Sequence, residues 1–306
     1  MKTVRNIQIQ TENKEELFPD FTDTFPYTAT RAELHRYPGR IAPWHWHQSV
    51  ELFYMESGEL EYSTPGGTIR FPAGSGGMVN SEVLHMTKTL SRTGETIQLL
   101  HIFHPALLAG ERGSRIDSRY ISPLTRSQQI QLIPLFPENP EHQKILDLLR
   151  TSFQISDSLF GYELLLREAL SQIWLLLLQQ AQPLLEQESA PGKSSGQIKA
   201  MMTYIHEHYP EHISIRNLAS SAFLSERACF RMFRETLHMT PNEYITSYRL
   251  QRACRLLETG QDSITDISRA CGLGSSSYFG KVFREQFRCT PSDYRRNWQD
   301  REKMRP

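Results

Sequence analysis

The sequence predicts an α+β chain built from two domains, and three observations carry that prediction. Short β-branched and aromatic runs, broken by glycine and proline, fill residues 31–104. Helical periodicity replaces them after Pro140, and an internal repeat fills the last third of the chain. We therefore expect a small N-terminal β-barrel with following helices. We also expect an all-α C-terminal domain in which a long helix joins two helix-turn-helix motifs.

The expected strands lie close together, because clusters of glycine and proline interrupt the apolar runs. They are Ser49–Glu56, Leu60–Ser63, Thr68–Phe71, Gly77–Asn80, His85–Leu90 and Thr96–Phe103. Strands of this length and spacing are typical of a sandwich or a small barrel. We assign residues 1–140 to this β-rich domain.

Two helices are expected next, at Glu141–Phe153 and Tyr162–Ala181. The second is apolar on most faces, so it must be covered on more than one side. It lies either between the barrel and another subunit or fully buried inside one monomer, which makes residues 141–186 a dimerisation or packing segment. A stretch containing Ser, Gly and Pro, residues 187–196, is the expected linker to a C-terminal domain at 197–306.

Charge is unevenly divided along a chain whose net charge is zero. From Lys193 to the end there are 18 basic and 12 acidic residues, and the rest of the chain carries the matching acidic excess. This asymmetry indicates that the C-terminal part meets a polyanion.

Other features exclude several classes of protein. No apolar run approaches the roughly 20 residues that span a bilayer, and Met1–Gln10 lack the apolar core of a secretory signal. We therefore expect a cytoplasmic protein without membrane contact. No pair of cysteines has CxxC spacing, so an extracellular disulfide scaffold is excluded and a zinc ribbon is disfavoured.

The C-terminal part contains the same unit twice. The matching segments are 214–219 with 263–268, 231–235 with 281–285, and 240–244 with 290–294. In each unit a serine caps a short helix, a tight turn follows, and a second helix begins after another serine. That order is typical of a helix-turn-helix.

The two predicted turns differ in one residue. Gly272 in the second turn suits left-handed backbone, whereas Phe223 stands at the corresponding position of the first and predicts a different geometry there. Between the units, Thr240-Pro241 begins a helix that we expect to reach Glu258. Its 18 residues span roughly 27 Å. With its flanking turns, this helix can hold two recognition helices about one DNA turn, roughly 34 Å, apart.

This region closely resembles the AraC/XylS family of transcriptional regulators. The resemblance covers about residues 196–297 and rests on the double helix-turn-helix, the connecting helix, and the segments Ser275–Phe283 and Thr290–Arg295. It implies binding to double-stranded DNA and control of transcription. It also implies a homodimer and contact with RNA polymerase.

Candidate DNA contacts lie on one face of the second helix of each motif. They are Arg227, Phe230, Arg231, Ser276, Ser277, Gly280 and Lys281. Arg227 and Arg231 can each offer a bidentate fork to guanine, or a charge to phosphate. Phe230 either touches a thymine methyl or faces the core or a dimer partner. In the second motif Lys281 suits phosphate, and two serines and a glycine read bases poorly, so we expect this motif to anchor more than to specify.

The N-terminal part contains a second set of motifs. The spacing of the first cupin motif is met by Gly39, His45, His47, Glu51 and Gly58, and that of the second cupin histidine by Gly74 and His85. This part resembles the cupin-type sensor domains joined to many AraC/XylS proteins, so the expected barrel is cupin-like. The usual proline-rich turn is replaced here by residues 79–83.

Four residues of these motifs form the candidate N-terminal site. His45, His47 and Glu51 share odd parity, so we expect them to point inward from one strand region, with His85 arriving from a later strand. Three imidazoles and one carboxylate suit Zn²⁺, Mn²⁺, Fe²⁺ or Ni²⁺. The alternative is a polar pocket without metal, in which the same four residues bind a small-molecule effector such as a carbohydrate.

The leading hypothesis is therefore a transcription factor, not an enzyme, that responds to a small molecule bound in the N-terminal barrel. The alternative is a metal-dependent cupin enzyme fused to a DNA-binding domain. The C-terminal third of the chain has no catalytic use, which favours the regulator.

Overall fold

The computed structural model describes residues 1–7, 16, 18, 21–22, 24–91, 94–111, 113–127, 129–186, 195–237, 239–260 and 262–296. The chain separates into two compact units, with a boundary between Gly192 and Lys193. Among the described residues, no helix combines the length and apolar character needed to span a bilayer.

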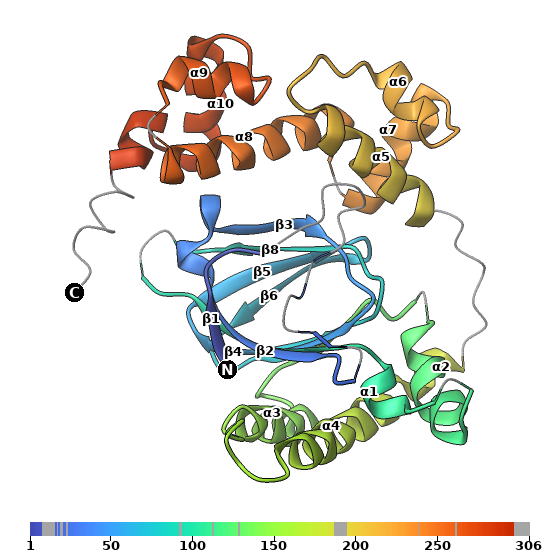
Figure 1. Ribbon diagram of the computed structural model, residues 1–306. Coiled ribbons are helices and arrows are strands. Elements are labelled where there is room, and N and C mark those ends of the chain that lie inside the picture. The colour runs from blue at the N-terminus through green and yellow to red at the C-terminus, as the bar shows by residue number, and fades with distance from the viewer. Residues whose placement is uncertain are drawn as a thin grey trace. The chain divides into compact units, whose positions relative to one another are not determined.

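Two facing sheets form the N-terminal unit (Figure 1). The six-stranded sheet has the order β1 (Lys2–Val4), β2 (Tyr27–Glu33), β9 (Ile97–Phe103), β4 (Val50–Ser57), β7 (Gly76–Val79) and β10 (Leu132–Leu135). The four-stranded sheet has the order β3 (Ile41–His45), β8 (His85–Thr89), β5 (Glu59–Thr64) and β6 (Gly67–Pro72). Within the described strands the two sheets do not join, so the cupin-like barrel is open. Phe53, Tyr62 and Phe71 pack between the sheets.

Strands β4 to β9 confirm the six predicted strands, with ends that differ by a few residues. Strands β1, β2, β3 and β10 lie outside those six predicted ranges and complete the sheets. Two single 3-10 turns, Leu34–Arg36 and Pro38–Arg40, lie between β2 and β3.

Helices cover the outer face of the six-stranded sheet (Figure 1). They are α1 (Ala106–Ala109), a π-helical turn (Asp117–Ile121), α2 (Ser122–Thr125), α3 (Pro140–Ser152) and α4 (Tyr162–Leu185). Leu170 and Leu177 of α4 share one apolar cluster with Phe103 of β9. The opposite face of α4 is open, because the side chain of Leu164 is 73% exposed. The alternative of a helix fully buried in one monomer is therefore wrong.

Six named helices make up the described C-terminal unit. They are α5 (Ser195–His208), α6 (Ile215–Ser220), α7 (Glu226–Leu237), α8 (Pro241–Thr259), α9 (Ile264–Ala270) and α10 (Ser276–Phe287). Helix α8 runs between the pair α6 and α7 and the pair α9 and α10 (Figure 1), as the repeat predicts. Because α5 begins at Ser195, the last two residues of the predicted linker are helical, while 187–194 lie outside the described residues.

Side-chain caps begin these helices where the sequence places them. Ser214 Oγ accepts from the Asn217 backbone N–H at 3.1 Å, and Ser263 Oγ accepts in the same way from Asp266. Thr240 and Glu243 form a reciprocal capping box at the start of α8. Each cap satisfies backbone donors that the first helical turn leaves unpaired.

The two turns have the same backbone geometry, so the prediction of a different first turn is wrong. Phe223 has φ +56° and Gly272 has φ +65°. What differs is the surroundings. The side chain of Phe223 is 97% exposed and meets no obstacle, whereas a Cβ at Gly272 would lie 2.5 Å from the Tyr209 carbonyl oxygen. Only the second turn therefore requires glycine on steric grounds.

Replacing Gly272 by alanine should destabilise the C-terminal unit more than the same change at Gly274. Both glycines have positive φ, so each variant carries a left-handed strain of about 1–2 kcal/mol. Gly274 has open space around its Cα, and only Gly272→Ala adds a clash with backbone. Urea unfolding of the full chain, followed by hydrogen exchange in α9 and α10, measures the loss of stability in each variant. Equal losses of stability in the two variants would show that the close approach of Tyr209 to Gly272 does not affect stability.

Candidate functional site

The four cupin-motif residues converge inside the N-terminal unit. His45 ends β3, Glu51 belongs to β4 and His85 begins β8, while His47 lies in the connection between β3 and β4. All four are at most 3% exposed. The ligand nitrogens of the three histidines lie within 4.8 Å of one another. The convergence arises because the chain crosses from one sheet to the other, not from the parity of one strand.

The three histidine rings are oriented by their own local backbone. The Nδ1 atoms of His45, His47 and His85 lie 2.6, 2.9 and 2.8 Å from the carbonyl oxygens of Pro43, Ser49 and Val83. A carbonyl oxygen only accepts, so each Nδ1 carries the proton and donates it. In the neutral ring, Nε2 is therefore the bare nitrogen, and all three Nε2 atoms face the interior.

Glu51 lies at the centre of this group. Its Oε2 is 3.5 Å from His47 Nε2 and 3.6 Å from His85 Nε2. Its Oε1 accepts a hydrogen bond of 2.5 Å from the Tyr62 hydroxyl. Among the described residues, the Nε2 atoms of His47 and His85 have no hydrogen-bond partner, although both are fully enclosed. These nitrogen and oxygen atoms therefore converge without a hydrogen bond of ordinary length between them.

Burial and mutual charge set the ionisation of the group. Burial alone raises the pKa of Glu51, but the imidazoles of His47 and His85 outweigh it and hold that pKa well below the usual range. Burial, together with the charges of His85 and His47, lowers the pKa of His45 well below its ordinary value. The site therefore contains a buried carboxylate that stays ionised, beside the rings of His45 and His47, whose lowered pKa favours the neutral form.

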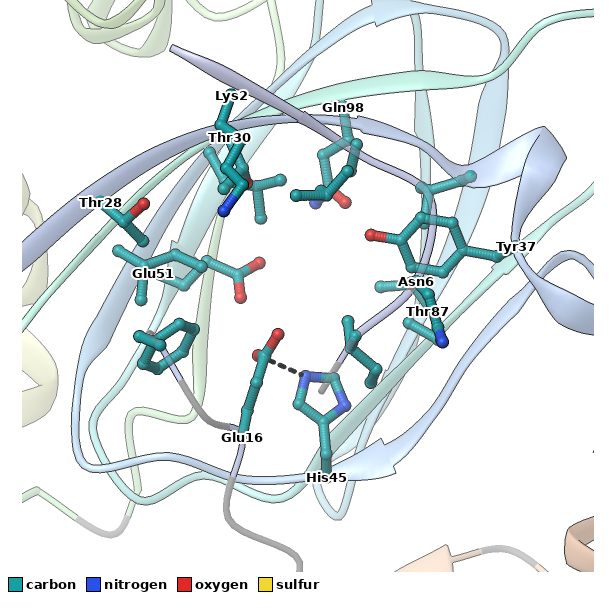
Figure 2. Close-up of a pocket in the computed structure, with 18 of the residues that line it drawn as sticks. Lys2, Asn6, Glu16, Thr28, Thr30, Tyr37, His45, Glu51, Thr87 and Gln98 are labelled. Atoms are coloured by element: carbon teal, nitrogen blue, oxygen red, sulfur yellow. Dashed lines mark ion pairs between the residues drawn. The ribbon is translucent and has the colours of Figure 1, made fainter. Parts of the chain in front are cut away.

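A cavity of about 120 Å³ adjoins this group, and Figure 2 shows polar atoms of both sheets pointing into it. His45 and Glu51 line both the cavity and the four-residue site. Glu16 also lines it, and its Oε2 lies 3.5 Å from His45 Nε2. Burial, and then the charge of Glu51, raise the pKa of Glu16. No sequence pattern pointed to Glu16, which belongs to no motif and precedes the first predicted strand.

Other polar residues of the cavity wall were also missed by sequence reasoning. They are Lys2, Asn6, Thr28, Thr30, Tyr37, Tyr62, Thr87 and Gln98. Two of them hold buried polar atoms without a hydrogen-bond partner among the described residues, Thr87 Oγ1 and Gln98 Nε2. Alternation along β9 explains the position of Gln98, since Leu100 and Ile102, two and four residues later, line the same cavity. A buried unpaired amide indicates a place for a polar ligand or water.

The predicted DNA-contact residues lie on the surface of the C-terminal unit. Arg227 and Arg231 of α7 are exposed, and so are Ser276, Ser277 and Lys281 of α10. Phe230 and Gly280 are partly buried at equivalent positions of the two helices. The faces beneath are apolar, with Cys229 and Phe233 buried under α7, and Phe279 and Phe283 buried under α10.

Comparison with known proteins agrees with both halves of this architecture. Residues 29–174 match the family model of an AraC-like ligand binding domain, and residues 218–297 match that of a helix-turn-helix domain. The chain is 26% identical over 286 residues to an uncharacterised HTH-type transcriptional regulator, YdeC, of Bacillus subtilis, covering 93% of this chain and 97% of YdeC. It is also 26% identical to the HTH-type transcriptional activator RhaS of Escherichia coli O1:K1 / APEC, covering 89% and 95%. Among solved structures, ToxT of Vibrio cholerae is 14% identical with a TM-score of 0.45, covering 88% of this chain and 98% of ToxT.

The chain therefore belongs to the AraC family of transcriptional regulators. Its N-terminal unit is the ligand-binding domain of that family, and its C-terminal unit is the DNA-binding domain with two helix-turn-helix motifs.

Proposed function

We propose that this regulator responds to a small polar effector, and that a divalent cation held by His45, His47, Glu51 and His85 forms part of the effector site. The observation that carries this proposal is the orientation of the three imidazoles. Each ring donates its Nδ1–H to a backbone carbonyl oxygen and directs its unprotonated Nε2 inward, toward a buried carboxylate.

The donor chemistry fits a cation. Two ligand atoms about 2.1 Å from one metal lie about 3.4 Å apart at the tetrahedral angle. The distances of Glu51 Oε2 from His47 and His85 Nε2, 3.5 Å and 3.6 Å, are close to that separation. Three nitrogen ligands and one oxygen ligand, without a thiolate, suit Zn²⁺, Mn²⁺, Fe²⁺ or Ni²⁺. The backbone carbonyls behind each Nδ1 supply the outer hydrogen bonds that usually orient metal-binding histidines.

The cavity beside the cation site indicates the class of effector. A cation supplies an attachment point for an oxygen atom of a bound molecule. The amide N–H of Gln98 and the hydroxyl of Thr87 then offer hydrogen bonds that are otherwise unmade. A small molecule with several oxygen atoms, either hydroxyls or a carboxylate, satisfies both requirements, and carbohydrates belong to this class. The relatives named as transcriptional regulators support a sensory role for the site and not a catalytic one.

Replacing His47 by alanine should remove the cation and the effector response together. Loss of one ligand should lower cation affinity by more than about 100-fold. Metal analysis of purified full-length protein measures the first effect. A reporter gene placed under the operator measures the second, and His45→Ala should behave in the same way. His142→Ala, a change in α3 away from the four-residue site, serves as the control. It should alter neither cation binding nor reporter output.

Two outcomes would contradict this proposal. If the wild type takes up no cation from a Zn²⁺ or Mn²⁺ titration, the cation site is wrong. If purified protein binds a cation and turns over a small molecule, while reporter output ignores His47→Ala, the metal-dependent enzyme is the better description.

We also propose a division of labour between the two DNA-contact surfaces. Arg227 and Arg231 lie one helical turn apart on α7 and present two guanidinium forks. The equivalent face of α10 presents Ser277 and Lys281, which have one charge and little capacity to discriminate bases. Helix α8, with 19 residues, has a length of roughly 28 Å, which suits two successive major grooves.

Alanine replacement should separate these roles. Arg227→Ala and Arg231→Ala should change the preferred operator sequence, by about 1–3 kcal/mol at the base that each contacts. Lys281→Ala should weaken binding to all sequences alike and reduce the salt dependence of affinity. Selection from randomised DNA with the full-length protein distinguishes the two effects. A shifted motif for Lys281→Ala, with an unchanged motif for Arg227→Ala, would reverse the assignment.

For the oligomeric state, we propose that the exposed face of α4 pairs with a second copy of the chain. Leu164 and Leu175 are 73% and 50% exposed, and both lie on the side of α4 opposite to the buried Leu170 and Leu177. A twofold pairing of this face buries the same leucines from both copies.

Charging this face should therefore dissociate the protein. The double change Leu164→Glu and Leu175→Glu places carboxylates opposite one another in the pair and should convert a dimer to a monomer in analytical ultracentrifugation. Lys88→Glu, on the exposed side of β8, changes the net charge by the same amount and should leave the dimer intact. A wild type that sediments as one chain would overturn the proposal.

A further inference from the structure

Glu16 occupies a defined place beside the four-residue site, although it precedes the barrel in the sequence. Its backbone N–H donates to the Trp46 carbonyl oxygen at 2.9 Å, between the two histidines of the first cupin motif. Its side chain is 10% exposed, and its Oε2 lies 3.5 Å from His45 Nε2 (Figure 2). Phe18, two residues later, packs its ring edge-on against His47, with 5.4 Å between ring centroids. These contacts hold Glu16 and Phe18 against the site.

The distances give Glu16 the same relation to His45 that Glu51 has to the other histidines. The three nitrogen–oxygen separations are 3.5 Å for Glu16 with His45, 3.5 Å for Glu51 with His47 and 3.6 Å for Glu51 with His85. None of these separations is that of a hydrogen bond of normal length, in which donor and acceptor atoms lie within about 3.2 Å of each other. Separations near 3.4 Å are those of neighbouring ligands around one cation.

The cavity places a second carboxyl group beside the same rings. Glu16 and Glu51 both line it, together with His45. Carboxylate oxygens and imidazole nitrogens together make a ligand set that Zn²⁺, Mn²⁺, Fe²⁺ and Ni²⁺ accept.

We infer that Glu16 is a further ligand of the cation, so that the bound ion ties this residue to His45 of the barrel. This inference rests on the cation site proposed above and adds a ligand that lies outside both cupin motifs. Because Glu16 also lines the cavity, its carboxylate occupies a position that an oxygen atom of the effector could take instead. The cation, the effector and Glu16 would then share one site.

The test is a calorimetric titration of the chelator-treated full-length protein with Zn²⁺ or Mn²⁺. Glu16→Gln keeps the shape of the side chain and removes its charge, so affinity should fall about tenfold to 100-fold while one ion still binds. Glu61→Gln is the matched control, because Glu61 pairs with Arg70 on β5 and β6, away from the cavity. It should bind the ion like the wild type, and His47→Ala should bind almost none.

Hydrogen exchange provides a second measurement, and its first part uses the wild type alone. In the wild type, the ion should slow exchange of the Glu16 amide, which donates to Trp46, and in Glu16→Gln this slowing should be lost. Equal affinity of Glu16→Gln and wild type, or a wild-type Glu16 amide that ignores the ion, would overturn the role of Glu16 alone. A wild type that binds neither ion would overturn the cation site and the role of Glu16 with it.

Discussion

Three local hydrogen bonds, each between residues two positions apart, determine the chemistry of the N-terminal unit. In each, a histidine Nδ1–H donates to a carbonyl oxygen only two residues away, at Pro43, Ser49 or Val83. Because the acceptors are local, the rings are oriented as soon as the ends of β3, β4 and β8 are in place. The inward direction of every Nε2 follows from these bonds. Glu51, Tyr62 and the cavity wall then have a fixed set of nitrogen atoms to face.

The strand pair β2 and β9 forms a wall shared by the cavity and the helices. Gln98 of β9 lines the cavity, whereas His101, three residues later, faces the helices. Tyr27 donates to His101 Nδ1 at 2.7 Å, and His101 Nε2 lies 2.8 Å from Ser152 Oγ at the end of α3. Burial lowers the pKa of His101 to about 3, so the ring stays neutral and both bonds persist at ordinary pH. The helices that carry the exposed leucines therefore rest directly on the wall of the effector cavity.

Local sequence patterns were enough to predict much of the architecture. The serine and threonine caps, the repeat and the connecting helix depend on residues a few positions apart, and the structure confirms them. Motif spacing also named His45, His47, Glu51 and His85, which the structure brings together. The reasoning from strand parity was wrong, because these donors come from both sheets and a connection between them.

Residues that reach the site through distant contacts had no pattern to reveal them. Glu16 meets His45 across 29 positions, and its neighbours belong to no motif. Tyr62 of β5 meets Glu51 of β4 across the space between the two sheets, and Gln98 faces the cavity through alternation on a strand whose register depends on β2 and β4. The left-handed Phe223 was misjudged for a different reason. Residue preference alone argues against it, but an open surface makes the small strain tolerable.

The unequal surroundings of the two turns determine which side chains each copy of the repeated motif can carry. Tyr209 and Pro210 lie against the backbone at Gly272, so a side chain there has no room. No such neighbour constrains Phe223, whose ring extends into solvent. The first turn can thus carry a large side chain despite its left-handed backbone, whereas the second has room for glycine alone. A substitution at position 223 therefore changes the surface that the first turn presents, whereas a substitution at position 272 disturbs the packing of Tyr209 and Pro210 against the second turn.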